Sequence, residues 1–361
     1  MEKAHHKIPV SPPASASAKS PAVRKVWRTD KAGAISNLTL REEPLDALHG
    51  EHIRVTVRAV GLNFADIFAL TGLYSATPKG SFIPGLEFAG VVTQVGATAN
   101  TDLRVGDRIY GCTRFGGYAT VVDVPPQHCR RLPDRWRFAE GAAFPAQSLT
   151  AYYALTHLGA VKSGRQVLVQ SAAGGVGLQA MRMARQMGAN PIGTVSSESK
   201  RQFLAQQGFD EIIVRGQDFA HQLQQRLDGR PLHCVLDGIG GEIQKQSFAA
   251  LSPTGRLVVF GAAEFTPGDR PNWLKAAWRY LRRPRYDVMD MISSNRAVLA
   301  FNLIWLWQEQ ALFDELLEGC AALGLPAPHI GHAFSFTQAH AAIEQLRCGR
   351  SVGKIVLNID E

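Results

Sequence analysis

A glycine-rich turn between an apolar strand and a helix constrains this chain more than any other segment. Residues 166–177 read Gln-Val-Leu-Val-Gln-Ser-Ala-Ala-Gly-Gly-Val-Gly, and a helix is predicted to start near Leu178. Such a turn presents backbone N–H groups at the positive end of a helix, where a pyrophosphate can bind. An ordinary strand–helix turn has the same pattern, so the neighbouring segments decide between the two interpretations.

Strand-like and helix-like segments alternate after this turn, to about residue 260. This order predicts an α/β fold with a doubly wound parallel sheet. Before residue 133, short alternating runs such as Ile53–Val60 indicate mostly β structure, and the strand-like Lys354–Ile359 is expected to rejoin it. The predicted organisation is a disordered tail at 1–22, a mostly-β domain at 23–146, a nucleotide-binding domain at 147–318 with a helical insert at 270–300, and a return to the first domain at 319–361.

Composition and cysteine spacing exclude several classes of protein. The 361 residues are 45% hydrophobic, which indicates folded domains rather than a disordered chain. The five cysteines are widely spaced without a CxxC pair, so neither a structural zinc motif nor a disulfide framework is expected. A reduced, cytoplasmic setting fits this pattern. The net charge of +8 lies largely in two local clusters that lack a nucleic-acid-binding motif, so no nucleic-acid partner is expected.

The strand that follows the glycine turn indicates which dinucleotide binds. Ala172 takes the first position of a GxGxxG pattern, Gly174 the second and Gly177 the third. The next strand ends at Ser196, where an NAD site carries an acid for the ribose hydroxyls, and Lys200 follows within a turn. Hydroxyls and cations attract a 2′-phosphate, so the sequence predicts NADPH. A capped helix with solvated charges also explains these residues, and it is compatible with anion binding.

Three further positions are candidate cofactor contacts because of their place in the predicted sheet. Arg215 follows the next strand and is a second candidate phosphate ligand. Asp237 and Gly261 follow later strands, at the carboxyl edge where the nicotinamide half of a dinucleotide crosses the sheet. Ordinary turns explain each of these last two positions equally well.

Several sequence blocks occur in the order of a known family: residues 60–66, 72–74, 84–92, 105–111, 116–119, 149–152 and 172–177. Together they resemble the medium-chain dehydrogenase/reductase superfamily, in its zinc-free quinone oxidoreductase branch. Later segments at 272–274, 294–298, 301–303 and 352–356 resemble the synaptic vesicle membrane protein homologues within that branch. The resemblance implies a GroES-like catalytic domain, a Rossmann domain and a homodimer.

The resemblance also implies which residues line the site. It places Asn63 and Asp66 beside the nicotinamide and Tyr74 over the substrate cleft, as the catalytic candidates. Asp66 fits a structural carboxylate equally well. Tyr74 fits a pocket wall better than a proton donor, since a phenol with a pKa near ~10 is a weak acid. The further cofactor contacts implied by the resemblance are Thr150, Gly175, Val176, Phe301, Leu303 and Lys354.

The zinc-dependent members of the superfamily bind their catalytic metal at positions that correspond here to Asn63, Leu86 and a residue near Ala146. Leucine and alanine offer no donor atom to zinc, so no metal is expected. Hydride transfer without a metal needs an acceptor that is already electrophilic, which favours quinones and α,β-unsaturated carbonyl compounds. Two alternatives stay open: an enoyl-thioester reductase, and a catalytically idle NADPH-binding protein with a regulatory or membrane-associated role.

The predicted helical insert mixes Trp273, Trp278 and Tyr280 with a basic run at Arg279–Arg285. One interpretation is an amphipathic helix that contacts a membrane peripherally. The preferred interpretation is a lid or a dimer contact with solvated arginines. No run of ~18 apolar residues occurs, so no transmembrane helix is expected.

Overall fold

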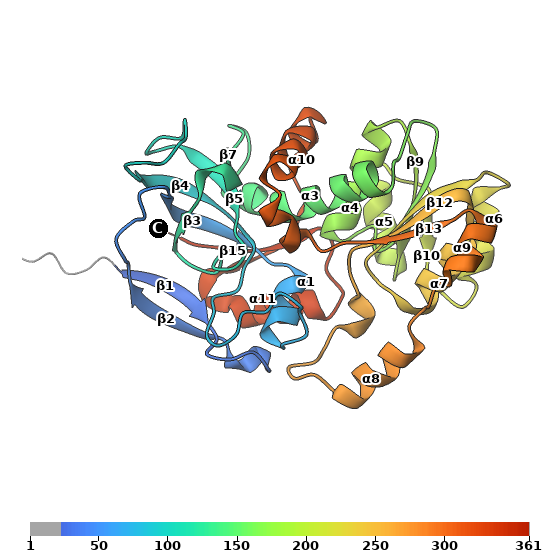
Figure 1. The fold of residues 1–361 in the computed structure, drawn as a ribbon, viewed down its shortest axis with the longest axis horizontal. Helices are drawn as coiled ribbons and strands as arrows, with labels where there is room; N and C mark the ends of the chain where they lie inside the picture. The colour runs from blue at the N-terminus through green and yellow to red at the C-terminus, as the bar shows by residue number, and fades with distance from the viewer. Residues whose placement is uncertain (1–22, 361) are drawn as a thin grey trace, which may run out of the picture.

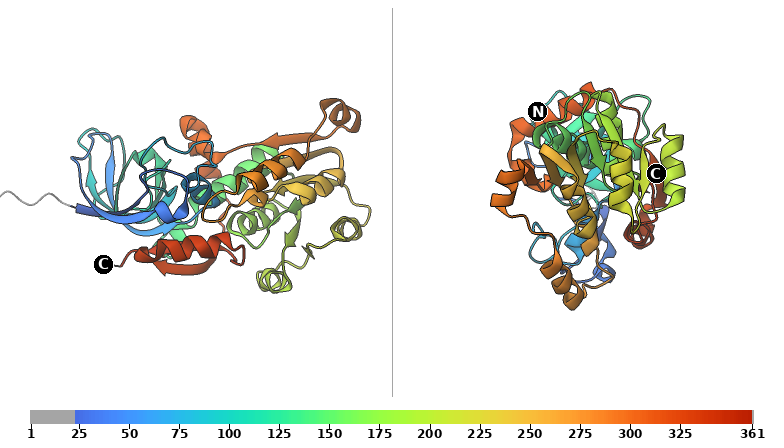
Figure 2. Two further views of the ribbon diagram at one scale, coloured as in Figure 1. Left: turned by 90° about the horizontal axis from the view of Figure 1, so that it is seen from below. Right: turned by 90° about the vertical axis from the view of Figure 1, so that its right-hand side faces the viewer.

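The computed structural model describes residues 23–360, and the predicted disordered tail at 1–22 lies outside the described residues. The chain forms two parts that lie side by side, one built around a mostly antiparallel sheet and one around a parallel sheet (Figures 1 and 2). The predicted α/β fold class is confirmed, because strands and helices alternate through the second part.

The first part contains a two-stranded sheet and a seven-stranded sheet. In the larger sheet the order is β14-β15-β3-β4-β5-β7, and β6 pairs with β3 outside that path. Buried and half-exposed residues alternate along β3, so one face of the sheet packs on the core. The strands are β1 (Val23–Arg28), β2 (Thr39–Pro44), β3 (Ile53–Gly61), β4 (Glu87–Val95), β5 (Arg108–Cys112), β6 (Val121–Val124), β7 (Cys129–Arg131), β14 (Ile330–Ser335) and β15 (Lys354–Asn358).

The second part is a six-stranded parallel sheet of order β10-β9-β8-β11-β12-β13. Its central strand β8 is buried at every position, as expected of a parallel strand covered on both faces. The strands are β8 (Gln166–Val169), β9 (Asn190–Val195), β10 (Ile212–Val214), β11 (Leu232–Asp237), β12 (Leu251–Val259) and β13 (Ala297–Ala300). The crossover helices are α4 (Gly175–Gln186), α5 (Glu198–Gln206), α6 (Phe219–Leu227) and α7 (Gly241–Ala249).

The remaining helices connect the two parts or cover their faces. They are α1 (Phe64–Leu70), α2 (Phe138–Ala142), α3 (Pro145–Tyr153), α8 (Trp273–Arg282), α9 (Val288–Ser294), α10 (Gln310–Ala322) and α11 (Ala339–Arg347), with short helices η1 (Ile35–Asn37), η2 (Pro126–His128), η3 (Ala154–Leu158), η4 (Ala263–Phe265), η5 (Leu303–Gln308) and η6 (Phe336–Gln338). None of the helices in the described part of the chain is long and apolar enough to span a bilayer.

The helical insert predicted at 270–300 differs from the structure at its end, where a strand replaces the expected helix. After α8 and α9, residues Ala297–Ala300 form strand β13 and extend the parallel sheet beside β12. This strand has four residues that are half-buried or exposed, too few to show a strand period between two helical stretches. Its partner strand, rather than its own pattern, determines its conformation.

The C-terminal segment returns to the first part and also contacts the glycine turn. β15 pairs with β3, and Gly353, immediately before β15, donates its N–H to the Ala173 carbonyl at 2.7 Å. The left-handed φ of 59° at Gly353 suits glycine, and a Cβ at this position would overlap the His329 carbonyl oxygen. The turn and the end of the chain are therefore fixed to each other.

Candidate functional site

The glycine turn links β8 to α4 as predicted. Ser171 adopts a positive φ of 53°, and Gly174 is the N-cap of α4. A Cβ at Gly175 would overlap the Gln147 amide, and one at Gly177 would overlap the Ser171 carbonyl oxygen. At Gly174 a Cβ would lie 3.3 Å from the Ser171 carbonyl oxygen, which is also a tight approach. The turn is therefore closely packed at all three glycines, and it leads directly into the N-terminus of α4, where a pyrophosphate can bind.

Three of the predicted cofactor contacts, Ala172, Val176 and Thr150, have different roles in the structure. Ala172 is fully buried and donates its N–H to the Thr194 carbonyl at 2.9 Å, so it shapes the turn. Val176 is half-buried and packs against the apolar core. The Thr150 hydroxyl donates to the Ala146 carbonyl one turn earlier in α3, at 2.7 Å, so it can still accept a hydrogen bond.

Two cationic side chains, Lys200 and Arg215, follow strands β9 and β10. Ser196 is exposed at the end of the strand, and the next residue, Ser197, caps α5 by accepting from the Lys200 N–H at 3.4 Å. The Lys200 ammonium donates to the Gly349 carbonyl at 2.6 Å. Arg215 donates to the Thr194 hydroxyl at 2.9 Å, from the start of the segment after β10.

Lys200 and Arg215 repel each other. Burial lowers the pKa of the Lys200 ammonium, and the positive charge of Arg215 lowers it further. Burial likewise lowers the pKa of Arg215, although Asp237 partly offsets that effect. Within residues 23–360, no salt bridge joins either side chain to a carboxylate. A bound anion would relieve this repulsion.

The acid in this region does not pair with either of these cations. Glu198, the first residue of α5, pairs with Arg201 one turn later at 2.6 Å. The Arg201 guanidinium is therefore engaged on the exposed surface of the helix, as expected of a solvated charge, and the charge of Glu198 is balanced locally.

A buried polar cluster joins the start of α1 to β4 and β15. The Asn63 amide donates to Glu87 at 2.8 Å and accepts from the Lys354 ammonium at 2.8 Å. Lys354 and Glu87 form an ion pair of 2.5 Å, with side chains 1% and 0% exposed. The second Glu87 oxygen accepts from the Ala146 N–H at 2.8 Å. Asn63 and Ala146 are two of the positions at which the resemblance places the metal ligands of the zinc-dependent members.

Asp66 lies next to this cluster and is 1% exposed. Its Oδ2 accepts from the Asn63 N–H at 2.8 Å and from the Tyr118 hydroxyl at 3.1 Å, while its Oδ1 is buried without a hydrogen-bond partner. Burial raises the pKa of Asp66 to about 7, against the opposing effects of those two donors and of Lys354. Because Oδ2 already accepts twice, a proton on Asp66 belongs on Oδ1.

Tyr74 connects the two parts of the molecule across the cleft. Its hydroxyl donates to the Asn302 side-chain oxygen at 2.7 Å, and burial raises its pKa to about 12. Beside it, Leu86 and Ile304 form an apolar cluster to which Phe115 also packs. Apolar side chains from both parts therefore pack together beside Tyr74.

The predicted residues at the other strand ends have structural partners. Both oxygens of Asp237 are occupied, because they accept from the backbone N–H groups of Ile239 and Gly240 and from the Gln244 amide. Gly261 approaches Gly238 so closely that a Cβ would lie 3.0 Å from its carbonyl oxygen. Both residues shape the carboxyl edge of the sheet.

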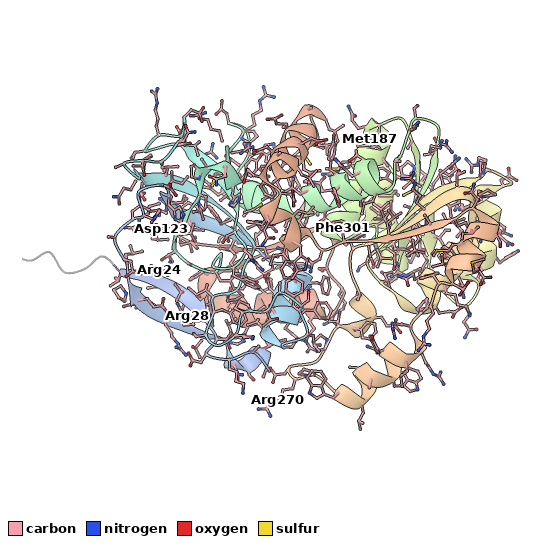
Figure 3. The ribbon with its side chains drawn as sticks, in the orientation of Figure 1. Arg24, Arg28, Asp123, Met187, Arg270 and Phe301 are labelled. Atoms are coloured by element: carbon pink, nitrogen blue, oxygen red, sulfur yellow. The ribbon has the colours of Figure 1, made fainter. Side chains whose placement is uncertain are left out.

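Phe301 and Leu303 follow strand β13, at the junction between the two parts. The Phe301 ring packs edge-on against Tyr153 with centroids 4.9 Å apart, near the middle of the molecule (Figure 3). Leu303 is the first residue of η5 and packs against the large apolar core of the second part. The strand that sequence reasoning missed therefore leads both residues to this junction.

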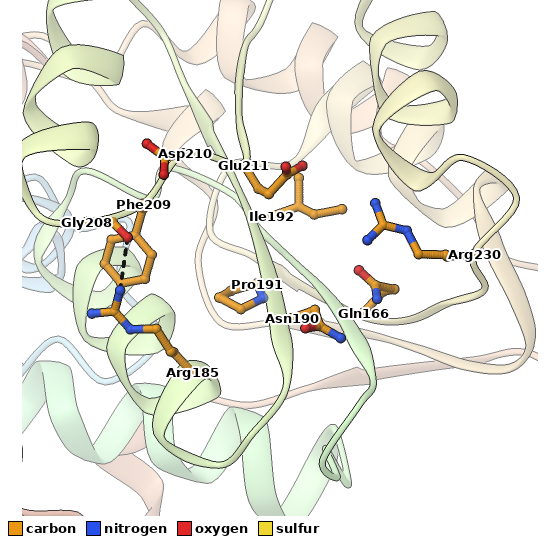
Figure 4. Close-up of a pocket in the computed structure, with 10 residues that line it drawn as sticks. All are labelled: Gln166, Arg185, Asn190, Pro191, Ile192, Gly208, Phe209, Asp210, Glu211 and Arg230. Atoms are coloured by element: carbon orange, nitrogen blue, oxygen red, sulfur yellow. Dashed lines mark hydrogen bonds between the residues drawn. The ribbon is translucent and has the colours of Figure 1, made fainter.

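Among residues 23–360, no group of three or more His, Cys, Asp or Glu side chains is arranged to hold a metal ion. A cavity of about 310 Å³ lies away from the residues described above (Figure 4). Its lining includes Gln166 and Asn190, the first residues of β8 and β9, and Arg185, which donates to the Gly208 carbonyl at 3.0 Å. It therefore opens at the amino ends of the strands, opposite the edge where dinucleotides bind.

The structure thus arranges most of the predicted residues in two groups, which the hydrogen bond from Gly353 to Ala173 links. The glycine turn, Lys200 and Arg215 form one group, and the polar cluster with Tyr74 forms the other. Sequence reasoning missed the roles of Tyr118, Asn302 and Gln147. Tyr118 and Asn302 lie inside sequence blocks that carried the family resemblance, whereas nothing in the sequence singles out Gln147.

Two family models match the two parts of the chain. The alcohol dehydrogenase GroES-like domain matches residues 49–134, and the zinc-binding dehydrogenase model matches residues 175–298. The synaptic vesicle membrane protein VAT-1 homologs of zebrafish and human are each 31% identical to the chain. The matches cover 87% and 84% of this chain, and they span 65% of the zebrafish protein and 78% of the human protein.

Solved structures show the same architecture. The quinone oxidoreductase from Thermus thermophilus, also solved in complex with NADPH, is 30% identical with a TM-score of 0.76, over 92% of this chain and 99% of that one. The CurK enoyl reductase is 26% identical with a TM-score of 0.79, over 93% of this chain and 99% of that one.

Proposed function

Because this chain belongs to the medium-chain dehydrogenase/reductase superfamily, we propose that it is an NADPH-dependent reductase that transfers a hydride to a quinone or to the C=C bond of an α,β-unsaturated carbonyl compound. It is an oxidoreductase of this superfamily that binds a nicotinamide cofactor. The cofactor supplies the hydride when it is bound. The side chains of the protein hold it, orient the acceptor and exclude water.

The observation that carries the choice of NADPH is the pair of cations after β9 and β10. Arg215 lowers the pKa of Lys200, and neither side chain forms a salt bridge with a carboxylate among the described residues. Ser196 is exposed at the end of β9, where an NAD site would have an acid. An anion at this point gains two charge-assisted hydrogen bonds. The NADPH-bound structure of the Thermus thermophilus quinone oxidoreductase supports the same choice.

The choice of acceptor rests on the apolar cluster where the two parts meet. This cluster includes Leu86, Ile304 and Phe115, and apolar surroundings favour a flat apolar acceptor over a charged one. At the positions of the zinc ligands of the zinc-dependent members, this chain has Asn63, Leu86 and a residue near Ala146. These side chains do not form a zinc site, so no zinc ion is expected to act as a Lewis acid on the acceptor. A quinone or an enone needs none, because its own conjugated carbonyl takes up the negative charge.

The polar cluster at the base of the pocket is held in one arrangement. The Asn63 amide is fixed by Glu87 on one side and Lys354 on the other, so its orientation is determined. Lys354 uses two of its three N–H donors in these contacts and keeps one for a cofactor or substrate oxygen. The preceding Gly353 is bonded to the glycine turn, which supports a position of Lys354 beside the dinucleotide.

The test of this proposal is NADPH consumption with a panel of quinones and enones, after NADPH binding has been established by fluorescence titration. We expect turnover with at least one member of the panel and much weaker binding of NADH. A folded, NADPH-bound protein that reduces none of them would leave the catalytically idle alternative in its place.

An enoyl-thioester reductase is the second candidate, favoured by the likeness to the CurK enoyl reductase. Such an enzyme also adds a hydride to a C=C bond conjugated with a carbonyl group, so the same cleft suffices. Turnover of a crotonyl thioester exceeding that of the simple enones and quinones would identify this candidate.

A further inference from the structure

The cavity of about 310 Å³ at the amino ends of the parallel strands has no part in the oxidoreductase function proposed above (Figure 4). Its volume suits a small molecule. The buried side chains that line it include Ile192 and Phe209. Exposed charged side chains of both signs complete the lining: Arg185, Asp210, Glu211 and Arg230. The cavity therefore combines an apolar base with charges of both signs.

The Gln166 side chain indicates that the cavity binds a ligand. Gln166 is the first residue of β8 and is only 5% exposed. Its backbone N–H donates to the His233 ring at 3.2 Å, whereas its side-chain amide has no hydrogen-bond partner among residues 23–360. Buried amide groups are normally paired, because an unpaired one costs free energy. Since Gln166 lines the cavity, a ligand bound there would supply the missing partner.

Polar side chains follow the edge of the sheet in the order of its strands, β10-β9-β8-β11. They are a carboxylate, two amides and a guanidinium: Glu211 before β10, Asn190 at the start of β9, Gln166 at the start of β8 and Arg230 before β11. Neighbouring strands lie about 4.8 Å apart, so the two amides separate the two charges. A ligand that spans this row needs a positive group at one end, a polar group in the middle and a negative group at the other.

Contacts within the protein orient these side chains and leave part of each one free. The Arg230 Nε and Nη2 donate to two carbonyls at the end of α6, so its Nη1 is available to a ligand. One Glu211 oxygen contacts Arg226 at 3.5 Å, and the other has no partner in the described part of the chain. The Asn190 Nδ2 donates to the Gly164 carbonyl at 3.1 Å, which leaves Oδ1 as an acceptor.

We propose that this cavity binds a dipeptide, with its ammonium group at Glu211, its carboxylate at Arg230 and its peptide group at the Gln166 amide. Two guanidinium groups and two carboxylates line the cavity, so a ligand with only one kind of charge would meet like charges, whereas a zwitterion can pair with both. A free amino acid carries both charged groups on one carbon and is too short for a row that crosses four strands. The peptide group both donates and accepts, as does the side chain of Gln166. An apolar side chain of the dipeptide would pack on Ile192 and Phe209.

Isothermal titration calorimetry of the full chain with glycyl-leucine tests the proposal. We expect saturable binding of glycyl-leucine and much weaker binding of three analogues: N-acetyl-glycyl-leucine, which lacks the ammonium group, glycyl-leucinamide, which lacks the carboxylate, and free leucine. Saturating NADPH should not displace the dipeptide, because dinucleotides bind at the opposite edge of such a sheet. The result is therefore independent of the proposed reductase activity.

Variants that remove one charge assign the two ends of the ligand. Arg230→Gln and Glu211→Gln should each weaken glycyl-leucine binding roughly 10- to 100-fold, because each removes a hydrogen bond between charged groups. Arg135→Gln and Glu51→Gln, at exposed side chains of the first part, are the matched controls and should leave binding unchanged. Arg230→Gln should also bind glycyl-leucine and glycyl-leucinamide alike, which a loss of folding alone would not produce.

Absence of saturable binding up to about 10 mM glycyl-leucine, in protein whose far-UV circular dichroism shows that it is folded, overturns the proposal. Binding of free leucine as tight as that of the dipeptide contradicts the length of the row. Displacement by NADPH would place the dipeptide in the cleft between the two parts instead. An equal loss of binding in the variants and in their controls would likewise remove the assignment to Arg230 and Glu211.

Discussion

Replacing Asp66 by asparagine should change how the stability of the protein depends on pH. Asp66 is 1% exposed, its Oδ1 lacks a partner, and burial raises its pKa to about 7 from 3.8. A folded-state pKa above the unfolded one means that the folded protein binds the proton more tightly. The stabilisation is therefore complete below about pH 3.8 and is lost as the pH rises through about 7.

The magnitude follows from the two pKa values. Each pH unit between them costs about 1.4 kcal/mol for one proton, so the wild-type protein should lose about 2–3 kcal/mol between pH 5 and pH 8 because of this group. Asparagine has the shape of the protonated acid, and its oxygen can accept from the Asn63 N–H and the Tyr118 hydroxyl as Oδ2 does. The variant should therefore lack this part of the pH dependence.

Urea unfolding at pH 5, 6, 7 and 8 gives the free energy of unfolding of the wild type and of the Asp66→Asn variant. The difference between the two proteins is compared across pH values, so the contributions of other titrating groups cancel. Asp134→Asn, at an exposed carboxylate, is the control for the change in net charge, and it should follow the wild type. We expect Asp66→Asn to gain stability relative to the wild type as the pH rises. Parallel curves across the whole range would refute the reasoning, because they would mean that Asp66 titrates alike in the folded and unfolded chains.

Three further predictions concern the cleft. Lys200→Ala and Arg215→Ala should each weaken NADPH binding about 10- to 100-fold while NADH binding changes little, as fluorescence titration would show; equal losses for both cofactors would refute a phosphate contact. Tyr74→Phe should alter kcat by less than about tenfold, since a hydroxyl whose pKa burial raises to about 12 is a poor acid, whereas a loss of about 100-fold or more in steady-state assays would indicate a proton donor. Lys354→Met should lower the free energy of unfolding by about 3–5 kcal/mol in urea, because Glu87 is left charged and buried, and Glu87→Leu with Lys354→Met should recover part of the loss; a double variant less stable than Lys354→Met alone would contradict this.

The parts of the fold that sequence reasoning predicted are those with local causes. The glycine turn could be predicted because close packing at Gly175 and Gly177 tolerates no side chain. The alternation around it could be predicted because apolar strand segments such as Val167–Val169 in β8 stand between helical patterns. β13 could not be predicted, since its four residues become a strand through pairing with β12. The same holds for α8, whose apolar pattern was clear while its outward orientation depends on the contacts of Arg279 and Asp269.

In the candidate site, too, some residue positions follow from the local sequence and others depend on contacts between distant segments. Ser196 and Lys200 follow directly from the end of a strand, so their place beside the turn could be predicted from spacing. The link between Tyr74 and Asn302 joins residues 228 positions apart, and the ion pair of Glu87 with Lys354 joins residues 267 apart. Such pairs depend on how the two parts dock and on the return of the C-terminal strand, which no local pattern encodes.

The most direct test of the central claim is single-turnover oxidation of bound NADPH, followed at 340 nm after rapid mixing of the NADPH–protein complex with a quinone or an enone. The account predicts stoichiometric loss of NADPH absorbance, a much slower reaction when NADH replaces NADPH at the same total concentration, and no effect of prior treatment with a metal chelator. Persistence of the NADPH absorbance with every acceptor in the panel, in protein shown to bind NADPH, would contradict it.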